Sequence, residues 1–251
     1  MRKLSIFLVA LAGLSLAGCY DTTQEITLKE DGSGTVTNSM DLSGLMTVAK
    51  TMGGAEEMEK AGDKKIDSTL SLAEGVDSIQ NLTPEEKKMA STGTLHIQMD
   101  LKGEKFITNL SFPFSKPGDI PAYNSLSNKI LGESMKDQAG GIAGGGDAEM
   151  PAMTFIDDYY SYEFSNGELK RKAIKEKYEK AGEDEYLKSL QESSGLGLTM
   201  KVNYIINLPR PVKAVEGKNV KLSDDKKKVT ISSTLDEFLA DASALEFKIK
   251  Y

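Results

Sequence analysis

The sequence lacks the residues on which most metal sites and catalytic centres depend. Its 251 residues include one cysteine (Cys19), one histidine (His96) and no tryptophan. One cysteine excludes an internal disulfide and a CxxC motif, and one histidine excludes HExxH zinc sites and other multi-histidine designs. Serine triads also lose their usual base, because we expect His96 on a solvated strand face. We therefore predict a protein that is not an enzyme and holds no metal and no cofactor.

Hydrophobic runs long enough to span a bilayer are also lacking. The apolar run 4–16 follows Arg2 and Lys3 and is shorter than the roughly 20 residues that a span needs. It ends in Leu16-Ala17-Gly18-Cys19, which resembles the lipobox of bacterial lipoproteins. This resemblance implies a signal peptide, residues 1–18, that is cut between Gly18 and Cys19. It also implies a diacylglycerol on the sulfur of Cys19 and an acyl chain such as palmitate on its new amine; a reactive thiol is the alternative.

Lipidation of Cys19 would determine where the protein acts. Each buried methylene of an acyl chain contributes roughly 0.8 kcal/mol, so two or three chains hold a protein firmly on a membrane. Tyr20 follows the cysteine, whereas an aspartate at this position favours inner-membrane retention in enterobacterial lipoproteins. We predict a cell-envelope protein anchored in the outer membrane, on its periplasmic or its surface side, with the membrane as its partner through the N-terminal lipid.

The balance of charge excludes another class of partner. The chain has 31 basic and 38 acidic residues. Removal of residues 1–18 takes away two of the basic ones, which leaves 29 against 38 and a net charge of −9. Nucleic acids and anionic lipid headgroups both reward basic surfaces. We therefore expect no nucleic-acid partner.

Alternating apolar residues predict strands that pair in hairpins. Residues 22–28 and 36–42 alternate on either side of the turn KEDGSGT. The DGSG segment also resembles the middle of an EF-hand calcium loop, but Lys29 and Met40 would take its first and twelfth ligand positions, which favours the turn. Further strands are expected over 95–101, 106–114, 160–164, 169–173, 198–208, 220–222, 229–231 and 245–251.

Helical periodicity and capping residues separate these hairpins. Thr83, Pro84 and Glu86 form a capping-box sequence that predicts a short helix start. Other helices are expected over 42–52, from Pro121 onward and over 175–192. The glycine-rich stretch 139–150 is low in complexity and predicts a flexible loop. The sum is an α+β fold: one domain over 19–251, with about eight to ten strands in antiparallel hairpins and three or four helices on one face, in one sheet or two abutting sheets.

Candidate binding and catalytic residues are few. Tyr159, Tyr160 and Tyr162 form the main aromatic cluster and are weak candidates for ligand binding, with packing on a sheet face as the alternative. A carboxylate-based hydrolase would need two acids about 5 to 10 Å apart in a cleft. The nearest candidates are Asp157, Asp158 and Glu163, and we regard this function as the least favoured.

Two segments resemble a known family. ITLKEDGSGTVTNSMDLSGLM, residues 26–46, and INLPRPVKAVEGKNVKLSDDKKKVTISSTLDEFL, residues 206–239, are similar to uncharacterised bacterial lipoproteins, including those with an LppM-like domain. The resemblance implies a membrane-tethered α+β domain without catalytic residues, with lipid or glycolipid binding in a cleft between helices and sheet. The present chain departs from that family in lacking a C-terminal transmembrane helix.

These observations lead to one principal hypothesis about function. We expect a non-catalytic envelope lipoprotein that binds a partner protein or an apolar or lipid ligand. The alternative is a structural or assembly factor of the outer membrane. A deep apolar pocket would favour the ligand, and a flat exposed apolar patch would favour a protein partner.

Overall fold

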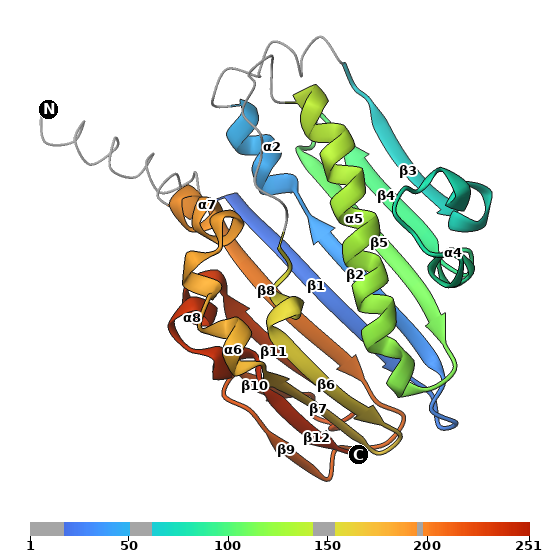
Figure 1. The fold of residues 1–251 in the computed structure, drawn as a ribbon, viewed down its shortest axis with the longest axis vertical. Coiled ribbons are helices and arrows are strands. Elements are labelled where there is room, and N and C mark those ends of the chain that lie inside the picture. The colour runs from blue at the N-terminus through green and yellow to red at the C-terminus, as the bar shows by residue number, and fades with distance from the viewer. Residues whose placement is uncertain (1–17, 51–61, 143–153, 195–197) are drawn as a thin grey trace, which may run out of the picture.

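The computed structural model describes residues 18–50, 62–142, 154–194 and 198–251. They form an α+β fold with one large and one small sheet (Figure 1), which confirms the predicted class. The described part contains twelve strands, more than the eight to ten expected, because two edge strands were not predicted: residues 65–71, which are mostly exposed, and the three residues 214–216.

The large sheet has eight strands in the order β10-β11-β8-β1-β2-β5-β4-β3. The predicted hairpin around DGSG is present as β1 and β2, and its turn has Gly32 at a φ of 84°, a conformation that glycine adopts readily. The strands are β1 Gly18–Leu28, β2 Gly34–Asp41, β3 Lys65–Ser71, β4 Thr94–Asp100, β5 Lys105–Phe114, β8 Leu198–Asn207, β10 Val220–Leu222 and β11 Lys228–Thr234.

The centre of the large sheet contains a parallel pair. β1 and β8 run side by side from Gly18 opposite Leu198 to Thr27 opposite Asn207, whereas the other strand pairs of this sheet are antiparallel. Hairpin patterns predict only the antiparallel pairs. Between β1 and β8 the chain forms β2 to β5 of the large sheet and two of the four strands of the small sheet, and β8 then returns beside β1.

The small sheet and the helices cover one face of the large sheet (Figure 1). The small sheet has the order β6-β7-β12-β9. Its strands are β6 Tyr160–Ser165, β7 Glu168–Ala173, β9 Ala214–Glu216 and β12 Phe247–Lys250. The helices are α2 Ser43–Ala49, α4 Pro84–Ala90, α5 Ile120–Ile142, α6 Lys175–Tyr178, α7 Glu185–Ser194 and α8 Leu235–Ala240, and the short 3-10 segments include η5 Ile156–Tyr159 and η6 Ala181–Glu183.

The core lies between the large sheet and this covering layer. Alternate residues of the central strands are buried, whereas their sequence neighbours are partly exposed, as expected for a sheet that is covered on one side. The buried strand residues include Ile26, Leu28, Val36, Leu110, Phe112, Val202, Tyr204, Ile206, Val229 and Ile231.

Two helical regions differ from their predicted bounds. The helix expected over 175–192 is broken: α6 ends at Tyr178, a 3-10 segment follows, and Asp184 then caps α7 by accepting a hydrogen bond from the Leu187 amide at 2.9 Å. α5 continues to Ile142 and so takes in the first residues of the predicted loop 139–150, while residues 143–150 lie outside the described part. No helix among the described residues combines the length and apolar character that a membrane crossing requires.

Candidate functional site

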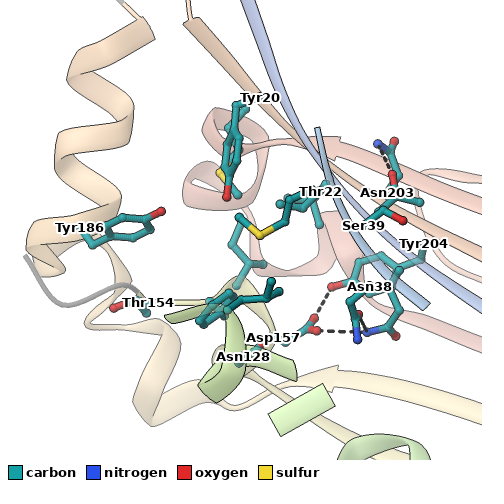
Figure 2. Close-up of a pocket in the computed structure, with 18 residues that line it drawn as sticks. Tyr20, Thr22, Asn38, Ser39, Asn128, Thr154, Asp157, Tyr186, Asn203 and Tyr204 are labelled. Atoms are coloured by element: carbon teal, nitrogen blue, oxygen red, sulfur yellow. Dashed lines mark hydrogen bonds between the residues drawn. The ribbon is translucent and has the colours of Figure 1, made fainter. Parts of the chain in front are cut away.

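A pocket lies on the covered face of the large sheet, where β1, β2 and β8 meet η5, α5 and α7 (Figure 2). The space between its walls measures about 590 Å³ with the open mouth included, and the centre of a water-sized sphere reaches about 70 Å³ of it. The pocket is therefore narrow, with room for a chain or small group but not for a bulky ring system.

Three successive rows of side chains on the sheet form one wall of the pocket. The two rows nearest the start of β1 are mainly apolar, and the third row is polar. In order from the start of β1, the rows are Tyr20–Met200, Met40–Thr22–Val202 and Asn38–Gln24–Tyr204.

The polar row lies at the end of the pocket away from the start of β1. Gln24 (5% exposed) and Tyr204 (2%) are as buried as Met40 (4%) and Val202 (5%) in the neighbouring row, whereas Thr22, Met200 and Phe155 on the pocket wall are half-buried. Figure 2 shows Tyr20 and Tyr186 toward one end of the pocket, with Asp157, Asn38 and Tyr204 toward the other. The pocket thus has a mainly apolar end and a polar end.

A buried ion pair between Arg171 and Asp157 adjoins the polar row. The Arg171 guanidinium, on β7, lies 2.9 Å from Asp157 Oδ1 and donates to the Leu245 carbonyl at 3.0 Å. The Tyr204 hydroxyl also donates to Asp157 Oδ1. The Arg171 guanidinium carbon lies 4.2 Å from the centre of the Tyr204 ring, within the range of a cation–π contact.

Burial fixes the protonation of these groups. Burial raises the pKa of Tyr204 well above its usual value, against the lowering effect of Arg171 and together with the raising effect of Asp157. Burial by itself lowers the pKa of Arg171, but Tyr162, Tyr204 and Asp157 raise it, and the net direction is upward. Tyr204 thus remains a hydrogen-bond donor and Arg171 remains charged throughout the physiological pH range.

Two residues of the predicted tyrosine cluster, Tyr160 and Tyr162, contact Arg171. The centre of the Tyr160 ring lies 3.7 Å from the Arg171 guanidinium carbon, and the Tyr160 hydroxyl donates to the Ala242 carbonyl at 2.7 Å. The Tyr162 hydroxyl accepts from Arg171 Nε at 3.2 Å, and the Tyr159 hydroxyl donates to Asp184 at 3.1 Å. None of the three tyrosines is among the residues that line the pocket.

The three candidate carboxylates occupy different environments. Asp157 faces the pocket and is ion-paired with Arg171, whereas Asp158 is exposed. Glu163 is paired with Lys170 at 2.7 Å. The predicted solvated histidine, His96, is partly exposed and lies 2.8 Å from Asp67. Among the described residues, no group of three or more acidic, histidine or cysteine side chains could hold a metal ion.

Sequence patterns alone did not single out Gln24, Asn38 or Arg171. Their strands are predictable, and Arg171 falls at an apolar position of the return strand between Leu169 and Ala173, which is the available signal of a buried charge. The meeting of Gln24 with Tyr204 depends on the parallel β1–β8 pair, which local patterns do not predict.

Comparison with known proteins gives little further guidance. No protein family model matches the chain, and no curated protein matches it. Among solved structures, the chain is similar to the NMR structure of the folded domain of the LppM protein of Mycobacterium tuberculosis, with a TM-score of 0.38 and 10% sequence identity; the match covers 92% of this chain and 90% of that one. No residue of the pocket is assigned from that protein.

Proposed function

We propose that the protein is a non-enzymatic lipoprotein of the cell envelope, anchored through Cys19, that binds part of a small amphiphilic ligand in the pocket. The observation that carries this proposal is the position of the pocket's apolar rows. They begin at Tyr20 and Met200, directly after the predicted lipidation site. A pocket whose apolar end lies at that place is suited to a molecule that reaches it from a membrane.

The outer membrane is the proposed location. The support comes from the sequence, because Tyr20 and not an aspartate follows Cys19. The ligand is favoured over a protein partner because only Leu70 and Leu222 are exposed large hydrophobic residues among those described, at 49% and 39%. They lie on β3 and β10, the two opposite edge strands of the large sheet, and so make no continuous patch.

The test combines the native protein with two single variants. The protein is produced with its own signal peptide, extracted from membranes in mild detergent, and analysed by native and denaturing mass spectrometry. We expect a chain that starts at Cys19 with an acyl mass, and an additional ligand mass that appears only in the native spectrum. Met200→Trp fills the apolar end of the pocket and should remove the ligand mass while leaving the acyl mass.

Lys201→Trp is the matched control. It places the same side chain at the next, exposed position of β8, on the opposite face of the sheet, and should retain the ligand. Equal ligand occupancy in wild type and Met200→Trp would contradict the pocket as the binding site. An uncut chain or a free thiol at Cys19 would contradict the anchor.

A further inference from the structure

The polar row of the pocket contains an acceptor that lacks a donor. A chain of hydrogen bonds fixes how the Gln24 amide is oriented. Ser127 Oγ donates to the Tyr123 carbonyl at 2.9 Å, and Asn38 Nδ2 donates to Ser127 Oγ at 2.8 Å. Asn38 therefore presents its oxygen to Gln24, and Gln24 Nε2 donates to that oxygen at 3.2 Å.

The Gln24 amide nitrogen is fully used. Besides Asn38 Oδ1, it donates to Asp157 Oδ2 at 3.3 Å. A flipped amide would place the Gln24 oxygen against two other oxygen atoms, so this orientation is the favourable one. As a result Gln24 Oε1 is buried and finds no donor among the described residues. A buried acceptor without a partner costs about 1–3 kcal/mol, so this position is suited to a donor supplied from outside the chain.

The charges around this position decide which donor fits. Asp157 contributes a carboxylate, and Gln24 contributes the dipole of an amide oxygen. Arg171 supplies no hydrogen-bond donor to the pocket, because its side chain has no exposed surface and donates to Asp157, Tyr162 and the Leu245 carbonyl. At this position a carboxylate or phosphate would therefore face the acceptors Gln24 Oε1 and Asp157, whereas a hydroxyl or ammonium would be stabilised.

The size of the pocket restricts the group further. A single water needs roughly 10–15 Å³ of the volume open to the centre of a water-sized sphere, and the pocket offers about 70 Å³. The whole pocket thus has space for a group of a few heavy atoms at most. Any longer apolar part must extend past Thr22 and Met200 toward the start of β1.

We propose that the pocket selects amphiphiles whose buried end is a hydrogen-bond donor, a hydroxyl or an ammonium group, and rejects those ending in a carboxylate. The donor binds Gln24 Oε1 beside Asp157, and the apolar part lies along Tyr20, Met40 and Met200. This inference rests on the proposed pocket function and specifies its ligand class.

Three probes with one chain length test the proposal on the wild-type protein. They are 1-octanol, its methyl ether and octanoate, each titrated by calorimetry at neutral pH. The ether retains the chain and an acceptor but has no donor, and octanoate adds a negative charge. We expect octanol to bind roughly tenfold more tightly than the ether, the factor that one buried hydrogen bond provides, and octanoate to bind more weakly than both.

Two variants identify the atom responsible. Gln24→Met keeps the length of the side chain and removes the acceptor, so octanol and the ether should then bind within about twofold of each other. Thr27→Met places the same side chain at an exposed position of β1 and should keep the full preference. Thermal unfolding of both variants checks that they remain folded, and the wild-type comparison needs no variant.

Each result has a defined meaning. Equal binding of all three probes to the wild type, lost in Met200→Trp, would keep the proposed pocket function and overturn the donor preference, with water occupying the polar row. A donor preference that persists in Gln24→Met would also overturn it. No binding of any probe would overturn the pocket function itself.

Discussion

Arg171 is the largest fully buried side chain among the described residues, and its surroundings show how the fold tolerates it. The ion pair with Asp157 at 2.9 Å is joined by a carbonyl acceptor and by the rings of Tyr160 and Tyr204. Removal of one partner of a buried pair leaves the other charge without compensation, which costs more than the pair itself contributes. This asymmetry leads to a prediction about single and double variants.

Arg171→Met should lower the free energy of unfolding by about 3–5 kcal/mol, because it leaves the Asp157 carboxylate buried without a cation. The double variant Arg171→Met with Asp157→Asn should be more stable than Arg171→Met alone, since the uncompensated charge is gone. Lys170→Met is the control: its partner Glu163 is exposed, and we expect a change within about 0.5 kcal/mol. Urea unfolding measures all three, and losses that add independently in the double variant would argue against this account.

Local sequence patterns predicted the secondary-structure elements better than they predicted which elements lie side by side. Thr83, Pro84 and Glu86 specify the start of α4, and the structure has both hydrogen bonds of the capping box. The β1–β2 hairpin is likewise correct, because its turn residues and alternation act over a short range. α8 was missed although Thr234 and Glu237 form the same capping box, since its six residues are too few to show a helical period.

A substitution at Gly34 tests how closely β1 and β2 pack against each other. A β-carbon there would lie 1.9 Å from the Thr27 carbonyl oxygen and 2.6 Å from the Phe114 ring. β2 lies between β1 and β5, so it cannot move away without disturbing one of them. We expect Gly34→Ala to lower the free energy of unfolding by about 1–3 kcal/mol or more, measured by the midpoint of urea unfolding.

Gly182→Ala is the control for this prediction. A β-carbon at Gly182 meets nothing within 4 Å and its φ is not positive, so the change should be neutral or stabilising by up to about 1 kcal/mol. A Gly34→Ala protein as stable as the control would show that the hairpin has more space than the structure indicates.

At the scale of the whole molecule, the parallel β1–β8 pair assembles the site and joins it to the predicted anchor. The sequence predicts each of the two strands separately, and the alternation within each strand predicts the face on which Gln24 or Tyr204 lies. Their contact is not predicted, because it joins positions 180 residues apart that no turn connects. Cys19 already lies in the same pair, opposite Thr199, and Tyr20 is only 7% exposed and part of the core. If Cys19 carries lipid, no free linker separates the folded body from the bilayer.

This arrangement predicts that the start of β1 and β8 lies against the membrane. The chain has no tryptophan, so a single introduced one is a clean reporter. In vesicles with brominated lipids, Thr199→Trp, opposite Cys19, should be quenched, and Lys227→Trp should not. Lys227 lies beside the far end of β8, where its carbonyl accepts from the Leu208 amide at 2.7 Å, and the ten residues of β8 span about 30 Å. Ten glycine and serine residues inserted between Cys19 and Tyr20 would reach about 17 Å on average and should abolish the quenching at position 199. Quenching that is equal at both positions, or unchanged by the insertion, would mean that the body lies on the membrane by a different surface and that the pocket receives its ligand from solution.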